Sequence, residues 1–596
     1  MKRTIVLESN GERLLEALWR CGIAIEGLCG GMGRCGKCRV RIIEYKGVMS
    51  KISSNELKLL NKRDLEKGYR LACMTWIKGT FKIEIEELSL DENIYTCIGY
   101  EPSIKFEPLV QYREVAITSL IRSTKLPLDK KLLEITRCCK YNLNVMNKFF
   151  NIIKNRKNIM YAIIHDNEII DIKETLKMYG LGIDLGTTKI AISLVDLVKG
   201  FIITHKVLHN PQIKYGSDVV SRIESVITGR VQLEDLRNIT LSEINRALSE
   251  IYDTYGINFQ DVYVSCIAGN TVMTHLLLGV NPESIGIYPY TPLISRPLVL
   301  RNSEFGLHMN SNGLIYIMPC LAGYVGGDVI ANLITTQIYK SGRYELLIDI
   351  GTNTEVILSL PNGNVLVTSA PAGSALEGVG IKCGVRAVKG AIDSVEITSN
   401  LEVRYTTIGN EKPIGITGTG LLDTIAQMLI KGLLDYSGKF RNINTERLRV
   451  INGVKEFVIV WKEESGTNND IVITQRDIRL VQEAIAAIKT AWMILLNMAN
   501  VSENRLSKII IAGSFGSRLK KDTILTLNLT PRVNPERIVY LGNTVLSGTR
   551  VVLKSRVMWG EVRRLAEDDK VKVIELAEHK DFNNLFIKNL FFKNWK

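Results

Sequence analysis

The feature that most constrains the fold of this chain is a short pattern that occurs twice. Leu181–Thr188 reads LGIDLGTT, and Leu346–Asn353 reads LLIDIGTN. Each copy is an apolar strand that ends near an aspartate, followed by a Gly-Thr turn and a second strand, at Ile190–Leu194 in the first copy and Val356–Leu360 in the second. A duplicated unit of this kind predicts two similar subdomains that face one another and hold one ligand between matching turns.

The residue types in these turns suit phosphate binding. Gly186 and Gly351 let the backbone approach a phosphate, whose oxygens accept hydrogen bonds from backbone N–H groups and hydroxyls. Asp184 and Asp349, at the strand ends, are the candidate catalytic residues, placed to hold a hydrated Mg²⁺. One such turn is weak evidence because Asp and Gly are common in turns, but two in register favour a shared ligand over unrelated hairpins. The candidate nucleotide-binding residues of the turns are Gly186, Thr187, Thr188, Gly351, Thr352 and Asn353.

Two further glycine turns follow in the sequence. Ile416–Asp423 (ITGTGLLD) opens a helix with an apolar stripe, and Ile509–Gly516 (IIIAGSFG) is a buried strand that runs into a turn. Thr474 is a plausible cap for the long helix that precedes the second turn. Such turns also serve ordinary helix–strand packing, but beside two phosphate turns we expect them to let the backbone lie against a base and ribose. The candidates are Gly418, Gly420, Gly513 and Gly516.

Four cysteines near the N-terminus predict a metal cluster. Cys29, Cys35 and Cys38 lie in one glycine-rich loop, LCGGMGRCGKC, with the spacing C-x5-C-x2-C, and Cys73 follows. Plant-type [2Fe–2S] spacing differs by one residue in the first gap. The loop glycines let the backbone wrap tightly and direct N–H groups at the sulfurs. The alternatives are a set of buried cysteines or a zinc site, but zinc usually takes paired C-x2-C units and only one is present.

Composition places the chain among multidomain globular proteins. It has 596 residues, 46% of them hydrophobic and 23% charged, enough for more than one core. The net charge of +14 comes from scattered Lys and Arg without a basic tract, which indicates a lysine-rich surface and no nucleic-acid partner, and leaves an acidic protein partner open. No apolar run approaches a membrane span of about 18 residues, and Glu8 and Glu12 come too early for a secretory signal. Eleven cysteines, four of them assigned to a cluster, argue against a disulfide framework. We therefore expect a cytoplasmic protein.

The pattern of apolar residues divides the chain into three parts. Strands and helices in residues 1–90 predict a small α+β domain; they are expected at Arg3–Glu8, Glu12–Arg20, Arg39–Ile43, Asn55–Lys67 and Phe81–Glu86. Residues 91–178 are a mixed connecting module whose role the sequence leaves open, with two short strands in Met160–Ile172 around a turn at Asp166. Residues 179–596 hold the duplicated unit, with a second lobe that starts near 343. Cys21, Cys138 and Cys139 are interpreted as structural.

The order of the glycine turns resembles the actin, sugar kinase and chaperone ATPase superfamily. With the N-terminal cluster domain, the chain resembles more closely the reductive activators of corrinoid-dependent enzymes, over nearly its whole length and least in the middle module. The motifs that carry this resemblance are RLAC at Arg70–Cys73, NPQ at Asn210–Gln212, YGSDVVSRI at Tyr215–Ile223, AGNTVMTHLLLG at Ala268–Gly279, GGDV at Gly326–Val329, AGSALEG at Ala372–Gly378 and TQRDI at Thr474–Ile478.

This resemblance implies both a fold and a function. The implied fold is an α+β β-grasp ferredoxin-like domain, a mixed connecting module and a duplicated α/β ribonuclease-H-like (actin-like ATPase) domain. The implied function is ATP-dependent reduction of Co(II) to Co(I) on a corrinoid protein, either a corrinoid iron–sulfur protein or the corrinoid subunit of a methyltransferase. The electron would come from the [2Fe–2S] cluster, with ATP and Mg²⁺ as the other cofactors. The donor that reduces the cluster is unknown, and a homodimer stays open.

One position departs from the family pattern, and two residues are left out of the candidate site. Ile485 stands where the family often has a lysine, which puts the nucleotide contacts of that helix, and the rate of ATP turnover, in question. His275 lies in an apolar segment, where a histidine is more often a core residue. Ser374, in a glycine-flanked loop, can equally serve a turn.

Two other functions fit the same domains. One is a small-molecule kinase with a ferredoxin sensor domain, which needs a general base near the γ-phosphate; no acidic residue stands in a kinase-like signature. The other is an ATP-driven, electron-donating activator of another metalloenzyme. An activator of a radical dehydratase usually has a [4Fe–4S] cluster between two subunits, and the cysteine set from Cys29 to Cys73 argues against it.

Overall fold

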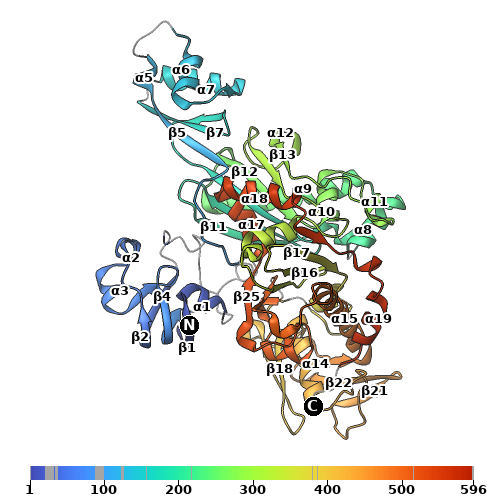
Figure 1. The fold of residues 1–596 in the computed structure, drawn as a ribbon. Coiled ribbons are helices and arrows are strands. Elements are labelled where there is room, and N and C mark those ends of the chain that lie inside the picture. The colour runs from blue at the N-terminus through green and yellow to red at the C-terminus, as the bar shows by residue number, and fades with distance from the viewer. Residues whose placement is uncertain are drawn as a thin grey trace.

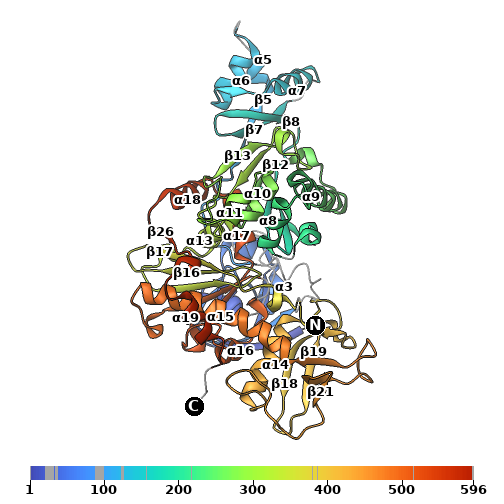
Figure 2. The same ribbon diagram turned by 90° about the vertical axis from the view of Figure 1, so that its right-hand side faces the viewer.

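The computed structural model consists of a ferredoxin-like domain, a small module and two lobes (Figures 1 and 2). It describes residues 2–20, 33, 38–86, 99–121, 126–155, 158–216, 218–378, 380–385, 387–513 and 516–592. Lobe 1 is built on the sheet of residues 179–317, and lobe 2 on the sheet of residues 345–573. The module lies at one end of the molecule, lobe 1 in the middle and lobe 2 at the other end.

The ferredoxin-like domain is a four-stranded sheet with one helix packed into its core. The strand order is β1 (Lys2–Arg13), β4 (Trp76–Glu86), β2 (Arg39–Met49), β3 (Tyr69–Leu71). Helix α1 (Leu14–Arg20) begins two residues later than the sequence predicts, because Glu12 and Arg13 still pair with β4. The apolar side chains of α1 and of the strands alternate into one core, as a half-buried sheet requires.

The helix predicted over Asn55–Lys67 is two short helices. Helix α2 (Ser54–Leu59) ends at Leu60, whose backbone is extended, and α3 (Lys62–Glu66) starts anew. Asn61 causes the break: its side chain accepts a hydrogen bond from the Asp64 N–H at 2.8 Å and so forms an N-cap inside the predicted helix.

The connecting module is a second four-stranded sheet, between a helical layer and lobe 1. Its interior residues alternate between two cores: Ala162 and Ile164 pack under the helices, whereas Ile163 joins a core that extends from lobe 1 into lobe 2. The predicted turn is present, with Asp166 in the left-handed conformation at φ 49°. In chain order the elements are β5 (Val110–Ala116), α5 (Ile117–Ile121), α6 (Leu128–Thr136), β6 (Lys140–Tyr141), α7 (Leu143–Lys154), β7 (Ile159–His165) and β8 (Glu168–Lys173).

The two lobes contain matching six-stranded sheets, which confirms the predicted duplication. In each sheet the first strand of the repeat forms an antiparallel hairpin with the second and pairs in parallel with a later strand on its other side. The order in lobe 1 is β11 (Ile202–His209), β10 (Lys189–Asp196), β9 (Tyr179–Leu185), β12 (Val262–Gly269), β14 (Leu314–Ile317), β13 (Leu298–Arg301). The order in lobe 2 is β25 (Ile538–Gly542), β24 (Lys508–Ala512), β15 (Glu345–Asp349), β16 (Thr354–Ser359), β17 (Val365–Ala370), β26 (Val571–Val573).

Helix α17 (Thr544–Lys554) connects the lobes. It follows the edge strand β25 of lobe 2, yet it packs against β9, β12 and α13 (Gly327–Thr336) of lobe 1. The approach is close at two glycines: a Cβ at Gly182 would lie 2.6 Å from Thr549 Oγ1, and one at Gly548 would lie 2.5 Å from the Ala331 carbonyl oxygen. The N-terminus of α17 therefore lies where the lobes meet.

Helix α15 (Gln475–Met498) is the core helix of lobe 2. Thr474 caps it in a reciprocal capping box with Asp477, at the predicted start of the helix. Within the described ranges it is the one helix long and apolar enough to cross a membrane, and 78% of its apolar window is buried in the protein. Ile485 is 2% exposed and belongs to the lobe 2 core.

Candidate functional site

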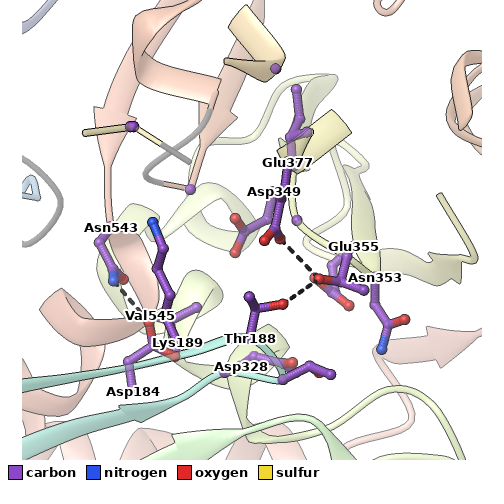
Figure 3. Close-up of a pocket in the computed structure, with 18 of the residues that line it drawn as sticks. Asp184, Thr188, Lys189, Asp328, Asp349, Asn353, Glu355, Glu377, Asn543 and Val545 are labelled. Carbon is purple, nitrogen blue, oxygen red and sulfur yellow. Dashed lines mark hydrogen bonds between the residues drawn. The ribbon is translucent and has the colours of Figure 1, made fainter. Parts of the chain in front are cut away.

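A cavity of about 220 Å³ lies between the lobes and is lined by both repeated turns (Figure 3). It brings together most residues predicted to bind nucleotide, namely Asp184, Gly186, Thr187, Thr188, Asp349, Gly351, Thr352, Asn353, Gly418 and Gly513. Gly420 and Gly516 do not line it. A Cβ at Gly420 would lie 2.5 Å from the Ile392 carbonyl oxygen, and one at Gly516 would lie 2.6 Å from Ile511 Cγ2. Helix–strand packing explains these two glycines.

The two turns touch each other through their hydroxyls. Thr188 Oγ1 and Thr352 Oγ1 lie 3.0 Å apart, and Thr352 donates to Glu377 Oε1 at 2.9 Å (Figure 3). A hydroxyl has one proton, so Thr188 donates to Thr352 while Thr352 donates to Glu377. A single hydrogen-bonded chain therefore crosses the cleft from lobe 1 to lobe 2.

Each aspartate of the repeat is held by an asparagine from the opposite lobe. Asn543, at the end of β25, donates to Asp184 Oδ2 at 2.8 Å, and Asn332, in α13, donates to Asp349 Oδ2 at 2.8 Å. The Thr544 hydroxyl donates to Asn332 Oδ1, the side-chain amide oxygen. Because Asn543 and Thr544 are neighbours at the start of α17, the two carboxylates are joined by one continuous set of contacts.

Asp184, Asp328, Asp349 and Glu355 are among the carboxyl groups that line the cavity, and burial raises the pKa of each of these four. The pKa of Asp184 rises to about 7, first because of desolvation and then because Asp349 and Asp328 are near. Desolvation likewise raises the pKa of Asp328 to about 7 and that of Asp349 to about 6. The pKa of Glu355 is raised well above its ordinary value by burial, then by Asp328 and Asp349. A cation in the cleft would favour the ionised form of all four groups.

The turn of lobe 1 is supported by a buried arginine. Arg222 is fully buried in α8 (Val219–Ile227) and donates to the Thr187 carbonyl oxygen at 2.6 Å and to the Gly216 carbonyl oxygen at 3.0 Å. Asn270, the N-cap of α10 (Thr271–Leu278), donates to Thr187 Oγ1 at 3.0 Å. Thr187 is therefore fixed at both its carbonyl and its hydroxyl.

Sequence reasoning missed several residues of this site. Asp328, Arg222 and Asn270 lie inside motifs quoted for the family resemblance, but nothing local marked them as site residues. Asn332 and Asn543 carry no local signal, because their partners are distant in the sequence. Gly513 was predicted, and the reason for a glycine is now visible: its φ is +85°, and a Cβ would lie 2.8 Å from Asp349 Oδ1.

Two of the four predicted cluster ligands lie within the described residues, and they converge. The Sγ atoms of Cys38 and Cys73 are 3.2 Å apart, and both side chains are 1% exposed. The Ala72 N–H donates to the Cys38 carbonyl oxygen at 2.8 Å. Cys29 and Cys35 fall outside the described residues, so their role stays a prediction. Two buried thiols at this separation fit a shared metal centre.

A buried ion pair fixes the segment that carries Cys73. Arg70 Nε lies 2.7 Å from Glu56 Oε1, with the Glu56 side chain fully buried and that of Arg70 5% exposed. Glu56 also accepts from the Leu71 N–H at 3.1 Å. Hydrogen bonds from Arg70, Ser53 and Leu71 outweigh desolvation and lower the pKa of Glu56, so the carboxylate is charged and paired.

His275 holds a loop in lobe 1. Its Nδ1 lies 2.8 Å from the Thr271 carbonyl oxygen, and Nε2 accepts from the N–H groups of Leu293 and Ile294 at 3.1 and 3.3 Å. The ring is therefore neutral, with its proton on Nδ1. The side chain of Ser374 lies outside the described part of the chain, and Ile485 does not line the cavity.

The fold and the site define a [2Fe–2S] ferredoxin-like domain joined to an actin-like ATPase. Family models match the chain in three places: the "2Fe-2S iron-sulfur cluster binding domain" at residues 2–78, the "RACo middle region" at 179–341 and the "C-terminal domain of RACo the ASKHA domain" at 343–596. The chain belongs to the RACo family, the reductive activators of corrinoid proteins.

Relatives match this chain along most of its length. The structure of a "Reductive activator for corrinoid,iron-sulfur protein" is 33% identical, with a TM-score of 0.76, covering 97% of this chain and 95% of that one. The "Corrinoid activation enzyme RamQ" of Eubacterium limosum is 27% identical over 603 residues, 96% of this chain and 94% of the relative. A "[Co(II) methylated amine-specific corrinoid protein] reductase" of Methanosarcina barkeri is 24% identical over 446 residues, 69% of this chain and 77% of the relative.

Proposed function

We propose that this chain uses ATP to drive the reduction of a corrinoid cobalt from Co(II) to Co(I) on a partner protein. The observation that carries the proposal is the presence, in one chain, of converging buried thiols and a cleft with two phosphate-type turns. Relatives named as corrinoid activators cover nearly the full length and support it.

The cysteines would hold the electron source. Cys38 and Cys73, together with Cys29 and Cys35, are the proposed ligands of a [2Fe–2S] cluster, which supplies a single electron when bound. Burial of the two described thiols, and the Glu56–Arg70 pair behind them, keep the ligand segment in place. The cobalt of the partner gains that one electron.

The cleft would hold ATP with Mg²⁺. Asp184 and Asp349 are the proposed carboxylates for a hydrated Mg²⁺, which commonly keeps several waters and takes one or two carboxylates plus phosphate oxygens. Within the described ranges, no three His, Cys, Asp or Glu side chains converge closely enough to bind one ion directly. Binding through water and phosphate fits that spacing, and the raised pKa values of the carboxyls favour a counter-cation.

ATP is needed because the electron transfer is unfavourable. Plant-type [2Fe–2S] potentials lie at about −400 mV, and Co(I) is a still stronger reductant. Each step of about 59 mV uphill lowers a one-electron equilibrium about tenfold. Nucleotide binding can offset this only by favouring one conformation or complex over another. The cleft between two lobes provides such a conformational variable.

The identity of the partner is the finer part of the proposal. The relatives are named for a corrinoid iron–sulfur protein and for a methylated amine-specific corrinoid protein. Either a corrinoid iron–sulfur protein or a methyltransferase corrinoid subunit would supply the cobalt. A homodimer and a cytoplasmic location also remain proposals from the sequence.

The test follows cobalt reduction by its absorption spectrum. The reduced activator is mixed with a Co(II) corrinoid protein, with and without MgATP, and Co(I) is measured under anaerobic conditions. We expect ATP to raise the Co(I) yield, and Cys73→Ser to abolish it while nucleotide binding persists. Equal yields with and without ATP would refute the proposal. A phosphorylated small molecule detected after the reaction would instead support the alternative function, a small-molecule kinase with a ferredoxin sensor domain.

A further inference from the structure

The segment that leaves the ferredoxin-like domain, residues 99–109 (the strap), is attached first to lobe 2. Gly99 forms an antiparallel bridge with Gly542, and the Tyr100 N–H donates to the Leu541 carbonyl oxygen at 2.9 Å. The strap thus adds a short pairing to the free edge of β25. Helix α1 of the ferredoxin-like domain also lies against β25, and Tyr100 packs on the ferredoxin core. The ferredoxin-like domain is therefore docked on the edge of lobe 2.

The rest of the strap is attached to α17, on lobe 1. Glu101 forms ion pairs with Arg550 and, at 2.7 Å, with Lys554, and all three side chains are at most 4% exposed. Burial alone would raise the pKa of Glu101, but Lys554 and Arg550 hold it below its ordinary value. Further along, the N–H groups of Glu107 and Leu109 donate to the last carbonyls of the helix at 2.8 and 3.1 Å. A buried pair of this kind is costly to break, so the anchor is firm.

The strap crosses from lobe 2 to lobe 1 beside Asn543, the residue that donates to the Asp184 carboxylate in the cleft. A Cβ on Gly99 would lie 2.3 Å from the Asn543 carbonyl oxygen and 2.3 Å from Ser547 Oγ. The same Asn543 donates to Asp184 Oδ2 and caps α17 by accepting from the Leu546 N–H at 2.8 Å. One residue thus separates the strap from the nucleotide cleft.

We propose that the strap couples the nucleotide cleft to the docking of the ferredoxin-like domain, with Asn543 as the positioning residue. The strap spans both lobes, so a change in the angle between them displaces its lobe 2 contacts at Gly99 and Tyr100 from its lobe 1 anchor at Glu101. Nucleotide binding therefore alters how firmly the ferredoxin-like domain is held. This inference rests on the proposed function in taking the cleft ligand to be ATP.

Reciprocity makes the coupling measurable from the cleft. If nucleotide changes docking by some factor, a change in docking must alter nucleotide affinity by the same factor. Gly99 does not line the cavity, and Gly99→Ala drives a methyl group into the backbone carbonyl of Asn543 and into Ser547. The matched control is Gly560→Ala in α18 (Arg556–Glu567), where a Cβ meets nothing within 4 Å. The probe is MgAMPPNP, titrated calorimetrically into the full chain.

We expect Gly99→Ala to shift the Kd for MgAMPPNP about fivefold or more, and Gly560→Ala to leave it unchanged. Amide exchange at Tyr100 reports the docking directly, because that N–H bonds to Leu541. In the wild-type chain, MgAMPPNP should change this exchange rate about fivefold or more. Asn543→Ser keeps a side chain that can cap α17, but this side chain is too short to contact Asp184. The variant should therefore abolish the effect of MgAMPPNP on Tyr100 exchange.

Each failure has a separate meaning. An unchanged Kd in Gly99→Ala, with faster Tyr100 exchange showing that the strap has moved, overturns the coupling while the ATP site stands. If MgAMPPNP binds the wild-type chain but leaves the exchange rate of the Tyr100 N–H unchanged, the coupling is also overturned. This measurement does not require any variant to fold. A wild-type chain that binds no adenine nucleotide overturns the proposed function itself.

Discussion

The two repeated turns have nearly the same sequence but different supports. In lobe 1 the turn after Asp184 is held from its own lobe, by the buried Arg222 at the Thr187 carbonyl and by Asn270 at the Thr187 hydroxyl. In lobe 2 the hydroxyl of Thr352 instead donates to Glu377, which lines the cavity. The first turn is fixed by buried donors and the second by a carboxylate beside the cleft.

The difference indicates unequal roles for two similar halves. A turn fixed by a fully buried guanidinium has little freedom to adjust. A turn whose hydroxyl faces a carboxylate can exchange that contact for a phosphate or cation when a ligand enters. We infer that the lobe 1 turn is the rigid half of the grip and the lobe 2 turn the adjustable half. The predictions below test this difference between the lobes. The first concerns the two aspartates, for which we expect equal effects in both lobes.

The largest effect is expected from the paired aspartates. Asp184→Asn and Asp349→Asn should each lower ATP hydrolysis about 10²- to 10³-fold, because each removes a carboxylate that we propose holds the hydrated Mg²⁺. The spectrum of the iron–sulfur centre should not change. Steady-state phosphate release at saturating MgATP measures the loss.

The matched control for this experiment is Asp253→Asn, which changes an exposed carboxylate on α9 (Leu233–Tyr255) and should leave hydrolysis within about twofold. If one of the two cleft variants kept near-normal activity, the cation would depend on a single lobe and the paired-turn model would be wrong.

The next effect concerns stability and is confined to lobe 1. Arg222→Ala should destabilise the protein by about 2–4 kcal/mol, because the carbonyls of Thr187 and Gly216 lose a buried donor. Denaturant unfolding measures the loss, and amide exchange locates it in lobe 1. Arg230→Ala, at an exposed arginine of the same lobe, should cost no more than about 0.5 kcal/mol. An equally small loss of stability in Arg222→Ala would contradict the inference that the lobe 1 turn is the rigid half of the grip.

The sequence was sufficient where a contact is local. The strand–turn–strand units, the Thr474 cap and the turn at Asp166 depend on neighbouring residues, and they were predicted near the right positions. The helix break at Asn61 was also local, and it was overlooked because the apolar spacing continues across it. In that case side-chain capping outweighed the periodic pattern.

The cross-lobe partners could not be predicted in this way. Asn332 and Asn543 reach Asp349 and Asp184 only because α13 and α17 pack on the far side of the cleft, and no spacing in the sequence encodes that arrangement. Glu101 gives the same lesson: its partners lie hundreds of residues later in the chain. Gly420 and Gly516 show the reverse error, since a glycine in a turn fits close packing as well as ligand binding.

A smaller effect should separate the two turn hydroxyls. Thr352→Val removes both the contact with Thr188 and the donor to Glu377, whereas Thr188→Val removes only the first. At about 1 kcal/mol for each net hydrogen bond, we expect Thr352→Val to weaken MgAMPPNP binding about thirtyfold and Thr188→Val about fivefold. Calorimetric titration measures both. Losses in the reverse order would make lobe 1 the adjustable half.

The smallest expected effect is a pH response that separates the lobes. Burial lowers the pKa of His275 and lowers that of His205 well below its ordinary value; both lie in lobe 1. At these two histidines the unfolded chain binds more protons than the folded one just below pH 6.5, so each lowers the stability of lobe 1 by about 1 kcal/mol per pH unit as the pH falls. The raised pKa values of Asp184 and Asp328 act in the opposite direction, because the folded chain binds protons there first. Amide exchange at pH 7 and pH 5.5 should show lobe 1 loosening relative to lobe 2, whose Asp349 and Glu355 also have raised pKa values. His275→Gln should reduce that response and His579→Gln, outside lobe 1, should not; a uniform response of both lobes would mean that the buried histidines do not set it.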